Sequence, residues 1–352
     1  MTLNRTALMR TALLGLHASG LHRLMPRSMS GLGAILMLHR VRETSHAGFA
    51  PNSILDVTPQ FLEQTILQVK KLGYACVSLD DAMRRLESGD TSQRFVVFTL
   101  DDGYRDNFTH ALPVFEKHGV PFTIYLSTSL PDGNAELWWY ALERVIAKAE
   151  QVSLEANGVQ HHFQTATLDE KRRAYDQLYW ILRRMDERAA REQVSRLAHA
   201  HGVDVAEITR EAAIGWEELR QLARHPLASI EAHTADHVAL AAESEAQARD
   251  DVAHGLTRIE VELGRKPRHF SYPYGDKIAA DSSSFELIRR EFDFRSATTT
   301  RKGLLKRSHR GQMHALPRLS LNGGLQDARI VEVLLSGLPF ALGRLAALNG
   351  VD

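Results

Sequence analysis

Cysteine is almost absent from this chain of 352 residues, because Cys76 is the only one. A single cysteine cannot form an intramolecular disulfide, so the sequence gives no support for an oxidising compartment. Net charge is also lacking, since 43 Lys and Arg residues balance 43 Asp and Glu residues. This balance removes the overall electrostatic attraction to nucleic acid, which usually requires a basic surface. We therefore expect no nucleic-acid partner.

Long uncharged apolar runs are missing as well. The apolar stretch 330–348 contains Glu332, Pro339 and Arg344, whereas a membrane-spanning helix needs ~20 residues with almost no charge. No transmembrane helix is predicted. Instead, residues 326–352 are expected to form a C-terminal helix that packs on the domain or lies at an interface.

The N-terminal residues 1–30 place basic side chains on both sides of a short apolar run, 11–16. A secretory signal would have ~7–15 apolar residues followed by small residues at a cleavage site. Because Gly15 interrupts the run and basic residues return at 22–23, an uncleaved amphipathic helix fits better. The sequence thus favours a cytoplasmic protein and leaves peripheral membrane contact and secretion open.

Short apolar runs bounded by polar loops recur along most of the chain and are too brief for helices. They predict strands at 34–38, 75–79, 95–100, 122–126, 228–230, 269–272, 294–297 and 315–319. Helical patterns with capping residues lie between several of them, at 59–72, 82–87 and 246–263. This alternation implies a parallel sheet, either open or closed into a barrel.

From about residue 136 to 224 the sequence becomes charged, helical and poor in strands. We interpret this stretch as a helical insertion between two halves of an α/β core. The predicted organisation is an N-terminal helix in 1–30, a core made of 31–135 and 226–325, an insertion in 136–225 and a C-terminal helix in 326–352.

Two adjacent carboxylates stand at the end of one predicted strand. Residues 95–103 read Phe-Val-Val-Phe-Thr-Leu-Asp-Asp-Gly, so the strand delivers Asp101 and Asp102 to its carboxyl end. A buried strand has no use for two charges there unless something pairs with them. Ligands bind at this end of the strands in parallel α/β folds. The pair therefore indicates a site more than a structural cap.

Two further segments also follow predicted strands. His233 and His237 are four residues apart, a spacing that lets both imidazoles share one metal ion. Tyr274 lies in a Tyr-Pro-Tyr-Gly turn that could direct its N–H toward a neighbouring oxygen, while His39 and Arg318 end the first and last strands. One Asp and two His form the three-ligand, open-position site of a metal hydrolase, and a second Asp and a separate His can serve as base and acid.

Together these motifs resemble those of the polysaccharide deacetylase family, the NodB-homology carbohydrate esterases. Residues 98–103 look like the family's Thr-Phe-Asp-Asp-Gly motif with Leu100 in place of Phe, 233–237 match His-Ser/Thr-x-x-His, and 270–275 are similar to the third motif. The resemblance covers about 35–321 without the insertion. It implies a deformed (β/α) barrel of about seven units.

The resemblance also implies a divalent metal, with zinc favoured over cobalt or nickel, bound by Asp102, His233 and His237. Asp101 would be the base that deprotonates water, and the Tyr274 N–H would help to hold the oxyanion. The implied reaction removes N-acetyl groups from the sugars of a glycan or of its glycolipid precursor. The sequence gives no indication of the linkage or of the oligomeric state.

The sequence lacks two residues of the family pattern, so other residues must take over their roles. Ser271 stands where many members have arginine, so we assign Arg318 to orient Asp101. The late Leu-x-His motif that supplies the acid is not evident, although His309 and His314 lie in that region. Members that act on poly-N-acetylglucosamine place this histidine early in the domain. Residues 37–41, Met-Leu-His-Arg-Val, match that arrangement, so His39 is assigned as the general acid, with His314 in reserve.

Other functions use the same residues. An O-acetyl esterase or an amidohydrolase of small cyclic amides would keep the site and change the substrate, and a glycan-binding protein would have lost catalysis. The joint presence of the site residues argues against such loss. Trp138 and Trp139 are interpreted equally well as sugar-stacking or helix-packing residues, whereas Trp180 and Trp216 are expected to pack between helices.

Overall fold

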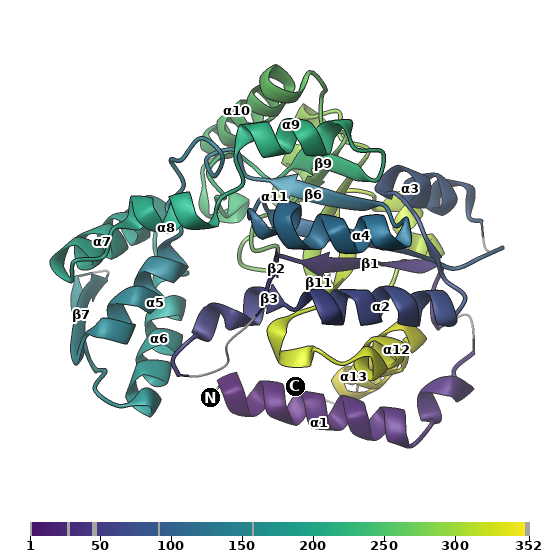
Figure 1. The fold of residues 1–352 in the computed structure, drawn as a ribbon, viewed down its shortest axis with the longest axis horizontal. Coiled ribbons are helices and arrows are strands. Elements are labelled where there is room, and N and C mark those ends of the chain that lie inside the picture. The colour runs from purple at the N-terminus through teal and green to yellow at the C-terminus, as the bar shows by residue number, and fades with distance from the viewer. Residues whose placement is uncertain (1, 27–28, 44–47, 91, 157, 349–352) are drawn as a thin grey trace.

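Seven parallel strands close into a barrel, as a computed structural model of the chain shows (Figure 1). The structure describes residues 2–26, 29–43, 48–90, 92–156 and 158–348; 27–28 and 349–352, in the predicted terminal segments, lie outside the described residues. Around the barrel the order is β1 (Gly33–Leu38), β12 (Leu316–Ser320), β11 (Ser296–Lys302), β10 (His269–Ser271), β9 (Ala228–Ala232), β6 (Phe122–Leu126) and β5 (Phe95–Asp102), and β5 pairs with β1 to close it. The predicted barrel of about seven units is confirmed.

The closing pair is in register from Gly33 opposite Phe95 to Leu38 opposite Leu100, and every residue of β1 and β5 is buried. Glycine is required at position 33, because a Cβ there would lie 2.4 Å from the Phe95 carbonyl oxygen. A short strand, β4 (Ala75–Cys76), pairs with the start of β5. The strand predicted at 75–79 is shorter than expected because α3 begins at Leu79.

Helices cover the outside of the barrel, and several begin at the predicted caps. The Thr58 hydroxyl accepts from the Phe61 N–H, and the Ser78 hydroxyl accepts from Asp81 N–H. These outer helices are α2 (Pro59–Lys71), α3 (Leu79–Ser88), α4 (Leu112–His118), α9 (Trp216–Arg224), α10 (Glu245–Leu263) and α11 (Ser282–Glu291). Beside the carboxyl end of β1, β2 (Arg40–Val41) and β3 (Asp56–Val57) form a separate parallel pair.

The segment between β6 and β9 has a hydrophobic cluster of its own and projects from one end of the barrel (Figure 1). It contains α5 (Trp138–Lys148), β7 (Gln151–Ala156), β8 (Val159–Gln164), α6 (Leu168–Leu182), α7 (Glu187–Ala200) and α8 (Val205–Ala212). The expectation of helices alone was wrong, because β7 and β8 form an antiparallel hairpin. In β7, buried Val152, Leu154 and Ala156 alternate with exposed residues, a pattern of period two that the surrounding charged sequence obscured.

The predicted C-terminal helix is broken into α12 (Ala328–Ser336) and α13 (Leu338–Leu348). Gly337 lies between them with a φ of 81°, and a Cβ there would lie 2.3 Å from the Met29 carbonyl oxygen. Close approach of the chain near Met29 therefore requires glycine at the break. None of the helices in the described part of the chain is long and apolar enough to span a membrane.

The N-terminal helix α1 (Thr2–Ala18) packs on α12, where Leu13 joins Ile330 and Val333. The predicted amphipathic pattern is wrong, because apolar residues are spread around the helix and Leu8 faces solvent. Beyond α1, a short 3-10 turn, η1 (Leu21–Leu24), brings His22 to Glu332 of α12.

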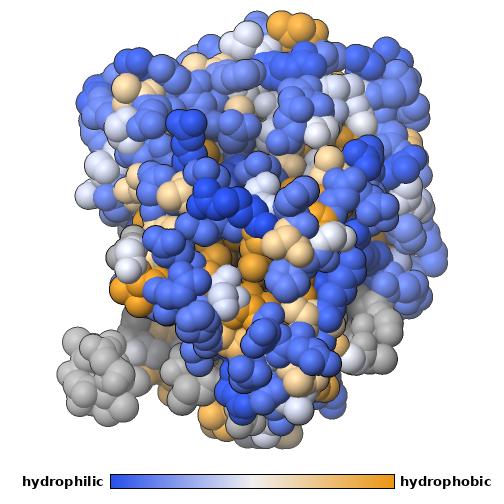
Figure 2. Space-filling model, turned by 90° about the vertical axis from the view of Figure 1, so that its left-hand side faces the viewer, coloured by the Kyte–Doolittle hydropathy of each residue, from blue (hydrophilic) through white to orange (hydrophobic). Residues whose placement is uncertain are grey.

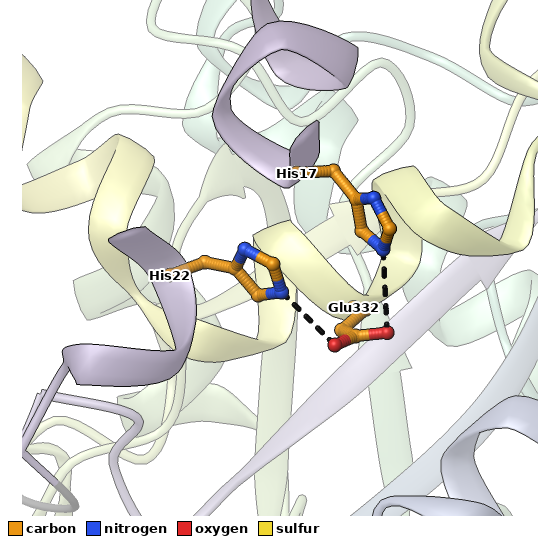
Figure 3. Close-up of side chains that lie close together, drawn as sticks. All are labelled: His17, His22 and Glu332. Atoms are coloured by element: carbon orange, nitrogen blue, oxygen red, sulfur yellow. Dashed lines mark hydrogen bonds and ion pairs between the residues drawn. The ribbon is translucent and has the colours of Figure 1, made fainter. Parts of the chain in front are cut away.

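Glu332 is the polar link between these segments (Figure 3). Its Oε1 accepts from His22 Nε2 at 2.9 Å and from Arg23 Nε at 3.4 Å, while Oε2 accepts from Gln68 Nε2 at 2.8 Å and lies 3.6 Å from His17 Nε2. Because the carboxylate is partly buried, loss of its charge leaves several donors without a charged acceptor.

We predict that Glu332→Gln loosens the docking of α1 by about 1–3 kcal/mol. Hydrogen exchange should accelerate across α1 and leave the barrel strands unchanged. Glu286→Gln is the matched control, because Glu286 forms an exposed pair with Arg289 on α11 that contributes little. Unchanged exchange in α1 of the Glu332 variant would show that apolar packing alone holds this helix.

Candidate metal centre and active site

Backbone strain is concentrated at the carboxyl ends of the barrel strands. Among the described residues, the non-glycine residues with φ in the left-handed region are Asp102 (77°), Thr234 (64°), His237 (56°) and Tyr274 (57°). Each such conformation costs roughly 1–3 kcal/mol and persists only where the surroundings impose it. All four residues belong to the three segments that the sequence singled out, so the strain marks one functional region.

Asp102, His233 and His237 come together as predicted, and all three are buried. Asp102 Oδ1 lies 3.4 Å from His233 Nε2 and 3.2 Å from His237 Nε2. These contacts lack hydrogen-bond geometry, and Oδ1 has no hydrogen-bond partner among the described residues. His233 Nδ1 lies 2.7 Å from the Ser271 carbonyl oxygen, so Nδ1–H donates there and the lone pair remains on Nε2. An orphaned carboxylate oxygen facing two imidazole nitrogens fits a divalent cation.

The electrostatics of the cluster agree with ligation by an anionic Asp102 and a neutral His237. Burial alone would raise the pKa of Asp102, but the neighbouring His237 and His233 outweigh it and hold the pKa well below its usual range. Burial lowers the pKa of His237, which favours the neutral ring. A carboxylate and neutral imidazoles are the protonation states that bind metal.

A second group of the same composition, His17, His22 and Glu332, lies beside α12 (Figure 3). Here both carboxylate oxygens already accept hydrogen bonds, in part from the cationic Arg23. Among the described residues, both oxygens of Glu332 therefore have hydrogen-bond partners. This group does not fit a cation in the way that the unpartnered oxygen of Asp102 does.

Asp101 points to Arg318, which lies in the middle of β12 rather than at the end of the last strand as predicted. Arg318 Nη1 and Nη2 donate to the two carboxylate oxygens of Asp101 at 2.7 and 2.6 Å, and both side chains are almost fully buried. Arg318 also donates to the Ser271 hydroxyl at 2.9 Å. The serine in the family's usual arginine position therefore contacts an arginine supplied by another strand. Burial would raise the pKa of Asp101, but Arg318 outweighs it and keeps the pKa below its usual value.

His39 and Tyr274, the other predicted site residues, line the same cavity of about 540 Å³ as the residues described above. Its lining includes Asp101, Asp102, His233, His237, His39 and Tyr274. His39 follows β1 and is half-buried, and its carbonyl oxygen accepts from the Asn107 side chain at 2.8 Å. The reserve histidine, His314, lies 2.9 Å from the Phe294 carbonyl oxygen through Nε2 and is not part of this lining. The geometry thus brings His39, rather than His314, to the cavity.

Tyr274 contacts neighbouring residues through its carbonyl, its phenol and its ring. Its carbonyl accepts from the Thr300 hydroxyl at 2.7 Å, its phenol accepts from Trp138 Nε1 at 3.0 Å, and its ring lies 4.7 Å from that of His237. The Arg183 guanidinium stacks 3.7 Å from the ring centre. Its N–H makes no hydrogen bond within the described part of the protein. That donor is therefore available at the edge of the cavity.

Sequence reasoning missed a clamp that α7 places on the loop of His237. Arg191 donates to the Asp236 carbonyl at 2.6 Å and to Glu187 Oε1 at 2.8 Å, and Glu187 Oε2 accepts from the Ala239 N–H at 2.8 Å. The strained backbone at His237 is thus fixed from both sides. The four-residue spacing of Glu187 and Arg191 signals only a helical pair, so nothing in the sequence distinguished it from exposed pairs on the same helix.

Comparison with known proteins decides the family. The polysaccharide deacetylase model matches residues 88–202 and 169–289, which together span more than half of the chain. The chain belongs to the polysaccharide deacetylase family. It is therefore a hydrolase of the deacetylase class, which acts on amide bonds, as the motifs predicted. No curated protein matches the sequence.

Solved structures confirm the fold of this deacetylase at low sequence identity. The Streptococcus pyogenes deacetylase PplD is 15% identical, with a TM-score of 0.56, and the match covers 86% of this chain and 97% of that one. IcaB from Ammonifex degensii is 17% identical, with a TM-score of 0.53 and the same coverage. A de-N-acetylase from Aggregatibacter actinomycetemcomitans is 15% identical, with a TM-score of 0.54, over 86% and 99% of the two chains.

We predict that Arg191→Ala weakens binding of a divalent metal at the candidate centre about 10–100-fold, because the loop of His237 loses its clamp. Competition with a chelator measures the affinity, and the absorption spectrum of the cobalt-loaded protein reports the ligand geometry. Arg196→Ala removes the exposed Glu192–Arg196 pair of the same helix and serves as control. Arg191→Lys should restore part of the affinity. Equal affinities in the Arg191→Ala and Arg196→Ala variants would refute a role of the clamp.

Proposed function

We propose that the protein removes N-acetyl groups from sugars of an acetylated glycan or of its glycolipid precursor. One observation carries this proposal: a buried, ionised Asp101, fixed by Arg318, stands beside three side chains that suit a divalent metal. A base adjacent to a three-ligand metal centre is the arrangement of hydrolases that cleave amides with water. Zinc is the metal we favour for Asp102, His233 and His237.

The chain's own residues supply the remaining chemistry. A divalent cation at the centre would polarise the acetamide carbonyl and make bound water more acidic. Asp101 accepts the proton from the attacking water, because Arg318 holds it ionised and aligned. The Tyr274 N–H donates to the carbonyl oxygen as negative charge develops there. His39, across the same cavity, protonates the departing amine.

The names of the structural neighbours support an acetyl substrate. The Aggregatibacter protein is called a de-N-acetylase, and the Streptococcus pyogenes protein was solved in complex with acetate. These words describe those proteins, which share only the fold with this chain. They favour the N-acetyl substrate over the cyclic amide among the functions that the motifs allow.

We expect Asp101→Asn to reduce acetate release from N-acetylglucosamine oligomers about 10²–10⁴-fold while zinc stays bound, because an amide cannot accept the proton. Acetate would be measured with added zinc, cobalt or nickel. Asp250→Asn is the matched control, since Asp250 also belongs to an adjacent Asp pair but is exposed.

Release from O-acetylated sugars alone would support the esterase function instead. Glycan binding without release from any acetylated compound would support the non-catalytic function. Full activity of Asp101→Asn would remove Asp101 from the mechanism.

Arg318→Met should shift the acid limb of the pH–rate profile to higher pH. Arg318 lowers the pKa of Asp101, so its removal raises that pKa, and the base is then ionised only at higher pH. The variant should also lose about 3–5 kcal/mol of stability, because a buried charge is left unpaired. Thermal unfolding separates the two effects, and Arg318→Lys should move the limb less. An unchanged acid limb in a folded variant would contradict the assignment.

A further inference from the structure

The cavity of the metal centre continues along one helix of the segment between β6 and β9. Besides the catalytic residues, its lining contains Arg172, Tyr175, Asp176, Tyr179 and Trp180, all from α6. Their spacing of three, four, seven and eight residues from the first places them on one face of the helix. On the side of the molecule that bears this segment, hydrophobic residues lie in a hollow between hydrophilic ones (Figure 2). One face of α6 therefore forms a wall of the cavity.

A continuous series of aromatic rings connects the metal centre to the outer end of this wall. The rings of His237 and Trp139 are 5.3 Å apart, and those of Trp139 and Trp138 are 5.7 Å apart. Tyr179 lies 5.3 Å from Trp138, and Trp180 lies 5.4 Å from Tyr179. Of these rings, His237, Trp139, Tyr179 and Trp180 line the cavity, whereas Trp138 is buried outside the lining. A ligand at the metal centre can therefore extend within the cavity toward Trp180.

Trp180 differs from the other tryptophans in its exposure. Trp180 is 38% exposed, whereas Trp138 and Trp139 are 4% and 6% exposed. Trp216 is partly buried, and its Nε1 donates a hydrogen bond to Asp132 at 2.7 Å. The prediction that Trp180 packs between helices was therefore wrong, because its position on α6 turns it toward the cavity. An exposed tryptophan beside a catalytic cavity leaves an apolar surface that a ligand can cover.

Hydrogen bonds and a ring contact hold Tyr175 of this wall against the neighbouring turn. The Tyr175 hydroxyl donates to Asn52 Oδ1 at 2.6 Å, and Asn52 Nδ2 donates to the Trp139 carbonyl at 2.9 Å. The Tyr175 ring also contacts Phe49 at 6.2 Å. These contacts tie α6 to the turn that forms another wall of the cavity, so little order is lost on binding.

We propose that this face of α6 is a binding subsite for the sugar next to the one that is deacetylated, with Trp180 and Tyr179 stacking on its ring. The inference rests on the proposed function and specifies its substrate class, an acetylated glycan of at least two sugars. Sugar rings have apolar C–H faces and polar edges, which match aromatic faces flanked by the charged Arg172 and Asp176. Continuity of this wall with the metal centre selects the neighbouring sugar as the occupant.

The test compares N-acetylglucosamine with its oligomers as substrates of the zinc-loaded protein. Trp180→Ala should raise KM for the oligomer about fivefold to tenfold, with kcat unchanged and the monomer unaffected. Trp180→Phe should restore most of the affinity, since it keeps a ring. Gln177→Ala, an exposed residue of α6 outside the cavity lining, is the control. An equal effect of Trp180→Ala on monomer and oligomer, or none on either, would overturn the subsite.

Equilibrium binding of the oligomer separates this inference from the proposed function. If the wild-type protein binds the oligomer more tightly than Trp180→Ala does but releases no acetate, the subsite stands and the catalytic proposal fails. If acetate is released and oligomer binding is the same in both proteins, the catalytic proposal stands and the subsite fails. Absence of any oligomer binding by the wild-type protein would overturn the subsite directly.

Discussion

The buried ion pair between Asp101 and Arg318 is the interaction on which the site depends. It joins β5 to β12 across the end of the barrel, and β1 pairs with both of these strands. Two charges without access to water are tolerated only when each satisfies the other with good geometry. The closed barrel supplies that geometry, because it brings the last strand beside the first. Closure of the sheet and ionisation of Asp101, the proposed base, therefore depend on the same contact between strands.

Among the described residues, every non-glycine residue with φ in the left-handed region lies at this same end of the barrel. Asp102 and His237 both have this strained backbone, and their side chains lie 3.2 Å apart in the proposed metal centre. This conformation needs support from outside the turn, and Arg191 and Glu187 supply it for the loop of His237. The segment between β6 and β9 thus serves the centre twice, as a clamp through α7 and as a cavity wall through α6.

The small side chain of Ser271 allows residues from different strands to meet at the site. Ser271 leaves room for the guanidinium of Arg318 and accepts a hydrogen bond from it, while the Ser271 carbonyl accepts from His233. One residue of β10 therefore contacts both Arg318, the partner of Asp101, and His233 of the proposed metal centre. A change at this position would disturb Asp101 and the proposed metal centre together.

The parallel strands and the three chemical segments could be predicted from the sequence alone, because both are local patterns. Local patterns left the sheet open or closed, and it was the family resemblance that implied its closure into a barrel. Strand-length apolar runs, capping residues and the motifs around Asp102 and His233 are all readable over a few residues. The hairpin β7–β8, the break at Gly337 and the exposure of Trp180 were not predicted, since each depends on what packs against the segment. The Glu187–Arg191 clamp has the same spacing as the exposed Glu192–Arg196 pair. Only the tertiary structure decided which pair holds the loop of His237, because burial and contact are properties of the folded chain.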